Sequence, residues 1–151
     1  MAKIALLTVV LMVIAGCATD ELRTVRTHST VEETLRCNSE NEVKIRVFHS
    51  MYKDKKSAEH LYSKIMANPS EDNLAQLMAA ARSDSMDMAS RKSGGDLGYI
   101  QFGELDKEFE ARLFNLPLKT LSNPVTSRWG WHLIWVSEAI NVKTGKPCQW
   151  R

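Results

Sequence analysis

Residues 94–136 read GGDLGYIQFGELDKEFEARLFNLPLKTLSNPVTSRWGWHLIWV, and this stretch decides the fold. It opens on Gly94-Gly95, two residues that reach backbone angles closed to other side chains and therefore mark a turn. Apolar residues with changing periodicity follow and predict four elements. These are a strand at 98–102, a helix at 105–116, an extended segment at 121–127 and, after Gly130, a strand at 131–136.

The residues immediately upstream predict another strand. From Val43 onward apolar residues alternate with polar ones, which is typical of a strand with one buried face. The inward face carries Val43, Ile45, Val47, His49 and Met51. His49 is thus a histidine on an apolar face, while Ser50 lies on the opposite face.

Helical spacing follows this strand. An amphipathic helix carries Ala58, Leu61, Tyr62, Ile65 and Met66 on one side and ends before Pro69, because the residue preceding proline disfavours helical angles. Ser70 is the predicted N-cap of a second helix, whose stripe is Leu74, Leu77, Met78 and Ala81. Polar residues 83–93 predict a short helix or turn. The resulting order, β-α-α-α-β-α-β-β, predicts an α+β domain with a largely antiparallel sheet.

Length and charge limit the classes of function. A chain of 151 residues with 44% hydrophobic residues has room for one compact domain. The net charge of +2 is too small, and the basic residues too scattered, for a nucleic-acid surface. We therefore expect no nucleic-acid partner.

The N-terminus predicts export. Lys3 precedes an apolar run from Ile4 to Ile14 that is too short to span a bilayer and is typical of a secretory signal. The ending Ile14-Ala15-Gly16-Cys17 resembles the lipobox of bacterial lipoproteins, which implies cleavage before Cys17 and lipid attachment there. An ordinary signal peptide with an incidental cysteine is the alternative. Residues 1–16 are then the signal peptide, and the polar residues 17–42 are a lipidated tether.

Several motifs recur in order along the globular part. They are Arg46-Val47-Phe48-His49, Ser85-Met86-Asp87, Gly94-Gly95-Asp96-Leu97-Gly98, Gly103-Glu104-Leu105, Phe109-Glu110, Pro124-Val125-Thr126-Ser127 and Gly130-Trp131-His132. This series resembles the parvulin-type peptidyl-prolyl cis-trans isomerases. The resemblance implies the parvulin (FKBP-like) fold, with a four-stranded sheet and about four helices, over residues 43–138. Residues 139–151 are then a C-terminal extension.

The resemblance also implies a site. It assigns His49 and His132 as paired histidines, Asp87 as the acid and Ser127 as a hydroxyl beside them. It assigns Leu97, Leu105 and Phe109 to an apolar pocket for the proline ring. Two readings stay open: a shifted register puts Val47 at the first histidine position, and the histidines are equally explained as neutral core residues.

No cofactor is required by such a reaction, because isomerisation transfers no electron or proton overall. We also expect no metal, since the Cys and His residues lack ligand spacing. In the parvulin fold the first strand begins beside the end of the last, so Cys37 and Cys148 are predicted to form a disulfide after export; two free thiols are the alternative.

Together these features predict a lipid-anchored isomerase on the bacterial cell envelope, on the periplasmic side of the outer membrane. Its partners are proline-containing unfolded or exported polypeptides and, through the lipid, a membrane. The alternative is a parvulin-like domain that binds unfolded segments at the envelope as a chaperone without useful turnover.

Overall fold

The computed structural model describes residues 36–68 and 72–150. Its elements, in chain order, are the 3-10 helix η1 (Glu40–Glu42), β1 (Val43–Tyr52), α1 (Lys55–Met66), α2 (Asn73–Asp84), α3 (Met88–Arg91), β2 (Asp96–Gln101), α4 (Lys107–Leu113), β3 (Val125–Ser127) and β4 (Gly130–Asn141). The predicted α+β class and the predicted order of strands and α-helices are confirmed.

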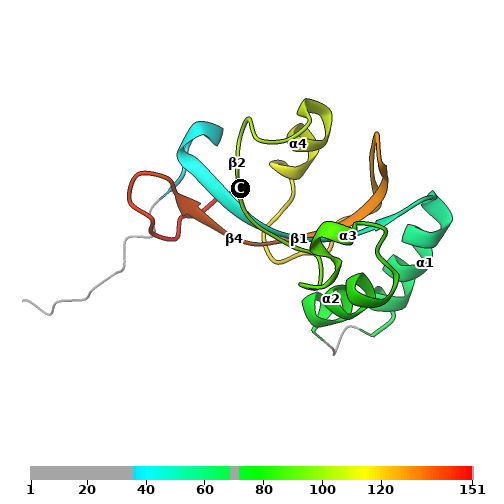
Figure 1. Cartoon of the computed structure of the whole chain (residues 1–151). Helices are drawn as coiled ribbons and strands as arrows, with labels where there is room; N and C mark the ends of the chain where they lie inside the picture. Colours follow the sequence, from blue (N-terminus) through cyan, green and yellow to red (C-terminus); the bar gives the residue numbers. More distant parts are fainter. Residues whose placement is uncertain (1–35, 69–71, 151) are drawn as a thin grey trace, which may run out of the picture. The chain divides into compact units, whose positions relative to one another are not determined.

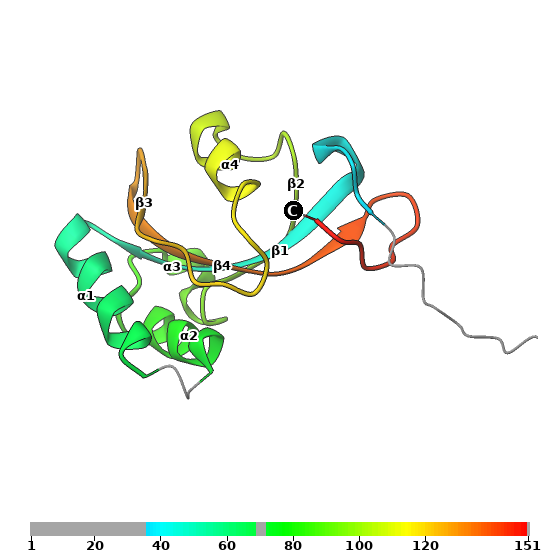
Figure 2. The same ribbon diagram turned by 180° about the vertical axis from the view of Figure 1, so that it is seen from behind.

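The strands form one antiparallel sheet in the order β2-β1-β4-β3. The two long strands β1 and β4 lie at its centre and pair from Val43–Asn141 at one end to Tyr52–Trp131 at the other. In both ribbon views α4 lies on one side of the sheet and α1 and α2 lie on the other (Figures 1 and 2). The sheet therefore separates two apolar clusters.

The alternation in β1 follows from which helices cover it. Val43, Ile45 and Val47 are fully buried in the cluster that includes residues of α4. Phe48 and Tyr52, on the opposite face, join the cluster of α1 and α2. Ser50 was predicted on the opposite face from the apolar residues, and there it is fully buried and donates to the Tyr52 hydroxyl at 2.8 Å.

Two bulges flank β1 and adjust the register on either side. Between Val47 and Phe48 the partners on β2 jump from Gly98 to Asp96, which leaves Leu97 as an extra residue. On the other side the partners on β4 jump from Glu138 to Val136. A bulge bends its strand and redirects a side chain, so Leu97 is positioned by an irregularity that apolar spacing does not reveal.

Gly95 permits the close approach of the chain to β1. Its φ is +79°, and a Cβ on this residue would lie 1.8 Å from the His49 carbonyl oxygen. The His49 amide donates to the Gly95 carbonyl at 2.9 Å. Only glycine combines this angle with this contact, so the turn predicted at Gly94-Gly95 joins β2 closely to the strand that carries His49.

Three local predictions were wrong. The second helix is capped by Asp72, whose carboxylate accepts from Leu74 N and Ala75 N, and not by Ser70, which lies outside the described residues. Helix α4 is shorter than predicted, because Asp106 caps it and Lys107 begins it, so Leu105 precedes the helix. Met66 is 46% exposed and does not belong to the buried stripe of α1.

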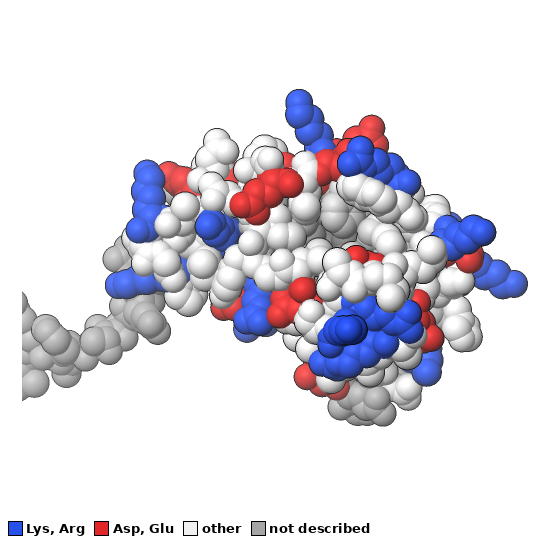
Figure 3. Space-filling view, viewed as in Figure 1, with Lys and Arg blue, Asp and Glu red and all other residues white. Residues whose placement is uncertain are grey.

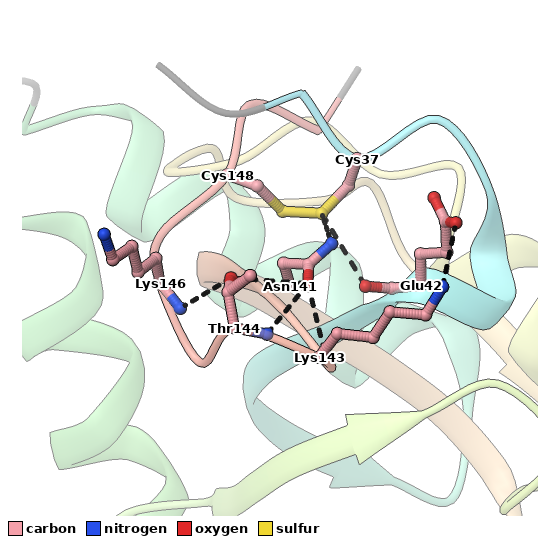
Figure 4. The surroundings of a disulfide bond; sticks show 7 residues. All are labelled: Cys37, Glu42, Asn141, Lys143, Thr144, Lys146 and Cys148. Carbon is pink, nitrogen blue, oxygen red and sulfur yellow. Dashed lines mark hydrogen bonds and ion pairs between the residues drawn. A yellow bond between two sulfur atoms is a disulfide. The ribbon is translucent and has the colours of Figure 1, made fainter. Parts of the chain in front are cut away.

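Residues before 43 and after 138 also pack against the domain. Cys37 and Cys148 are disulfide-bonded with their Cα atoms 5.7 Å apart, beside Asn141 at the end of β4 (Figure 4). Near the C-terminus Trp150 is 3% exposed, and its indole N–H donates to the Phe114 carbonyl at 3.2 Å. Residues on either side of the predicted domain thus belong to its core.

The membrane predictions fall outside this part of the chain. Cys17 and the apolar N-terminal run lie outside the described residues. Within 36–68 and 72–150, none of the helices has the length and apolar character needed to cross a bilayer.

We predict that the disulfide stabilises the domain strongly. It closes a loop with a sequence separation of 111 residues, and a loop of this length corresponds to about 4–5 kcal/mol in the chain-entropy model. Urea unfolding with and without dithiothreitol measures the difference. The double variant Cys37→Ser, Cys148→Ser should match the reduced protein and show no response to dithiothreitol. Equal stability of oxidised and reduced protein would contradict the prediction.

Candidate active site

Strands β1 and β4 bring two histidines together inside the sheet. The His49 and His132 rings are stacked, with centroids 5.3 Å apart and planes at 14°, and their Nδ1 atoms are 3.1 Å apart. Both residues are buried, with exposures of 5% and 3%. The structure therefore brings His49 to His132, whereas Val47 lies in the apolar core.

Asp87 reaches the first histidine from the start of α3. Its Oδ1 accepts from the Ala89 amide at 3.2 Å and caps the helix, while its Oδ2 lies 2.8 Å from His49 Nε2. The Ser90 hydroxyl donates to the same Oδ2. The Asp87 carboxylate thus bonds both to the first turn of α3 and to His49, and these two sets of contacts fix its position.

Ser127 reaches the second histidine from β3. Its Oγ lies 2.7 Å from His132 Nε2, and it accepts from the Trp129 amide at 3.1 Å in the turn between β3 and β4. Val125 pairs with His132, which aligns the short strand β3 with the site. The side chains from Asp87 to Ser127 therefore form one continuous row of hydrogen bonds.

The direction of these bonds follows from the carboxylate at one end. An ionised Asp87 only accepts, so His49 donates from Nε2, and in a neutral His49 ring Nδ1 accepts from His132 Nδ1–H. His132 Nε2 then accepts the hydroxyl proton of Ser127, whose oxygen accepts from Trp129 N–H. This assignment, made from the network of partners, leaves each histidine neutral and each donor satisfied.

The pKa values agree with neutral histidines. Burial lowers the pKa of His49 despite the favourable carboxylate of Asp87. Burial, assisted by repulsion from His49, lowers the pKa of His132 from 6.5 to about 4. Burial raises the pKa of Asp87, but hydrogen bonds from Ser90 and His49 outweigh this effect and the net pKa is lowered. The negative charge of the row therefore resides on Asp87 at neutral pH.

An apolar wall stands beside the histidines. The Phe109 ring of α4 lies 4.8 Å from the His132 ring, tilted by 48°. Leu97, at the bulge of β2, and Leu105, before α4, are partly buried against the same cluster as Phe109. Figure 3 shows the surface hollowed between α4, the β3–β4 hairpin and α3. Polar and apolar groups thus meet at one depression.

Two residues that hold this arrangement were missed by sequence reasoning. In the sequence Ser90 is one of many polar residues in 83–93, although a serine three residues after a capping aspartate is well placed to reach that carboxylate. Glu110 is part of the motif Phe109-Glu110, which gives its side chain no predicted role. It is 2% exposed, and its Oε1 accepts from the amides of Gly103, Glu104 and Leu105. Nothing in local apolar spacing reveals such a buried acceptor.

Among the described residues, no group of three or more His, Cys, Asp and Glu side chains is arranged to hold a metal ion.

We predict that stability falls as pH drops from 6.5 through 4. Unfolded chains bind a proton at His132 near pH 6.5, whereas the folded site resists it until about pH 4. The unfolded state therefore binds more protons in this window, and lowering the pH favours unfolding. The full difference corresponds to about 3 kcal/mol.

Urea unfolding between pH 7.5 and 4 measures this slope. His132→Gln should reduce it, whereas His60→Gln, at an exposed position on α1, should keep the wild-type slope. An unchanged slope in His132→Gln would show that another group is responsible.

Comparison with known proteins relates the chain to folding factors. It is 38% identical over 99 residues to the foldase protein PrsA of Caldanaerobacter subterraneus subsp. tengcongensis, covering 66% of this chain and 30% of PrsA. It is 50% identical over 54 residues to the chaperone SurA of Legionella pneumophila, covering 36% of this chain and 13% of SurA. The chain thus spans about a third of the length of the foldases it matches.

Solved structures show the same fold. The crystal structure of the peptidylprolyl isomerase PrsA from Bacillus anthracis has a TM-score of 0.58 and 25% identity, covering 74% of this chain and 45% of that one. The solution structure of NmPin, the parvulin of Nitrosopumilus maritimus, has a TM-score of 0.53 and 29% identity. It covers 62% of this chain and 95% of NmPin, so the similarity extends over nearly all of a small parvulin.

The family model that matches is Rotamase, the PPIC-type PPIASE domain, over residues 43–138. These residues include β1 with His49, the cap of α3 with Asp87, and β3 and β4 with Ser127 and His132. The chain therefore belongs to the PPIC-type peptidyl-prolyl isomerase family, the parvulins.

Proposed function

We propose that the domain catalyses cis-trans isomerisation of X-Pro bonds in unfolded polypeptides. The observation that carries this proposal is the polarised row from Asp87 to Ser127 beside the apolar wall at Phe109. The barrier to be lowered is about 18–20 kcal/mol and comes from the partial double bond of the amide. A catalyst has to bind the twisted amide better than the planar one.

The electrostatics of the row favour the twisted amide. A planar amide carries negative charge on its carbonyl oxygen through resonance, and twisting removes part of that charge. The carboxylate of Asp87 therefore disfavours the planar state of a carbonyl placed against it. The donors of His49 and Ser127 are engaged within the row, so they do not stabilise the planar carbonyl either.

The apolar residues beside the histidines bind the proline ring. Phe109 is 5% exposed and fixed against His132, while Leu97 and Leu105 retain partial exposure beside the same cluster. We assign these residues to the proline ring, because an apolar ring gains free energy on leaving water. Holding the ring while the preceding carbonyl rotates is then sufficient for catalysis.

The place of action is also part of the proposal. The lipobox at Cys17 supports a lipid-anchored protein outside the cytoplasm, and the Cys37–Cys148 disulfide is of the kind that persists in oxidising compartments. The relatives named foldase and chaperone support unfolded exported polypeptides as the substrates. The periplasmic side of the outer membrane is the location that we infer.

A second function, chaperone binding without turnover, is favoured by exposed apolar side chains near the site. Met86 and Met88, on either side of Asp87, are 49% and 70% exposed, and Trp129, two residues after Ser127, is 52% exposed. Flexible methionine side chains suit binding to varied apolar sequences. These residues provide a surface for unfolded chains that does not depend on the polar row.

We predict that Asp87→Asn lowers the rate of catalysed isomerisation. Asparagine is as good an N-cap as aspartate, so α3 should keep its cap while the row loses its charge. The expected loss in kcat/KM is about 100-fold, the lower end of the range for removal of one electrostatic group from a preorganised site. Exchange between cis and trans proline signals of an Ala-X-Pro peptide, measured by NMR, gives the rate.

Asp84→Asn is the matched control, since Asp84 lies at the exposed end of α2 and its carboxylate accepts from the Ser83 hydroxyl, which is not part of the row. Wild-type protein that exchanges no faster than buffer would refute the isomerase function. An aggregation assay on the same proteins separates the second function, which predicts equal suppression by wild type and Asp87→Asn.

A further inference from the structure

A separate hollow lies where β2 leads into α4. It has a volume of about 390 Å³ and is lined by Phe102, Gly103, Leu105, Lys107 and Glu110. Ligand sites in proteins range from about 300 to 1,000 Å³, so this hollow lies at the small end of that range and has room for one apolar side chain. None of its lining residues belongs to the row from Asp87 to Ser127.

Contacts with buried residues hold the walls of the hollow in place. The carboxylate of Glu110 accepts from the Gly103 and Glu104 amides at 2.8 and 3.1 Å and from Leu105 at 3.3 Å, which holds the backbone of this loop. The Phe102 ring packs edge-on against the fully buried Phe114, with centroids 5.4 Å apart. A hollow whose walls are already held requires little ordering when a ligand enters.

The hollow shares one residue, Leu105, with the proposed proline pocket. Leu105 lines the hollow and is also one of the residues that we assign to the proline ring. Glu110 lines it from α4, where it follows Phe109 directly. The hollow therefore lies next to the place where a polypeptide would put its proline against Phe109.

We propose that this hollow is a subsite for an apolar side chain next to the substrate proline, with Phe102 as its specificity-determining residue. The proposal rests on the proposed function, because the proline pocket sets the position of the substrate. Phe102 and Leu105 supply apolar walls, and Lys107 also lines the hollow with a side chain whose aliphatic stem suits apolar contacts. The Glu110 Oε1 atom accepts from three backbone amides, and the negative charge of this carboxylate disfavours an acidic substrate side chain in the hollow.

Binding of matched peptides to the full chain tests the subsite. Two pairs of proline peptides are used. The peptides of one pair carry Leu or Ser before the proline, and those of the other pair carry Leu or Ser after it. Titration of each peptide, followed by NMR through the amide chemical shifts of the protein, including that of Gly103, gives each Kd. We expect wild type to bind the Leu peptide about tenfold more tightly in one of the pairs, which corresponds to about 1.4 kcal/mol. Phe102→Ala should reduce this preference to about twofold.

Tyr99→Ala is the matched control. Tyr99 is an exposed aromatic residue on β2, three residues before Phe102, hydrogen-bonded to Glu138 and outside the hollow, so its removal should preserve the preference. Phe102→Trp is a second variant that fills the hollow while keeping an aromatic ring against Phe114, and it should also lose the preference. Equal affinities in both wild-type pairs, or a full preference in the Phe102 variants, would overturn the proposal.

Turnover of the same peptides distinguishes this outcome from failure of the proposed function. A preference for Leu that depends on Phe102, without catalysis, supports the subsite and refutes the isomerase. Catalysis without any such preference refutes the subsite alone.

Discussion

Two buried histidines that face each other across β1 and β4 impose the main constraint on this structure. A charged imidazole without full compensation is costly in the interior, and a neutral one must still satisfy both of its nitrogens. His49 and His132 satisfy one nitrogen each with the other ring, at 3.1 Å. The remaining nitrogens need one acceptor and one donor, which Asp87 and Ser127 provide from opposite ends.

Much of the local backbone is arranged around this requirement. A shift of one residue between β1 and β4 would turn one histidine to the opposite face of the sheet. Gly95 lets the chain before β2 touch the His49 carbonyl, and the cap of α3 brings Asp87 to its ring. The β3–β4 turn places Ser127. Segments far apart in sequence are thereby joined at one row of side chains, which also defines the depression beside Phe109.

The sequence predicted the parts of this arrangement that depend on local pattern. Alternation in β1 placed His49 on the inward face, and the order of elements predicted the α+β sheet. Apolar spacing continues through Leu105 and predicts that it is helical, but Asp106 is the N-cap of α4, so the helix begins only at Lys107. The cap of α2 is likewise Asp72 and not the predicted Ser70. A capping side chain is short and reaches only the amides two or three residues after it, so the cap is the polar residue directly before the first helical turn.

Other features depend on contacts between distant segments, and local pattern does not contain them. The bulge at Leu97 arises from pairing with β1, and the three amides that Glu110 accepts are defined only once the loop has folded onto α4. The roles of the site residues came from the family resemblance, because spacing alone does not distinguish a core histidine from a functional one. The structure adds the partner of each ring nitrogen, and with neutral rings these partners assign the direction of the hydrogen bonds.

That direction is the central claim, and the nitrogen chemical shifts of the imidazole rings test it most directly. At pH 7, long-range nitrogen–proton correlation spectra of the folded protein should show His49 protonated at Nε2 and bare at Nδ1. His132 should show the opposite tautomer, protonated at Nδ1 and bare at Nε2. An imidazolium at either position, or the same tautomer at both, would contradict the account.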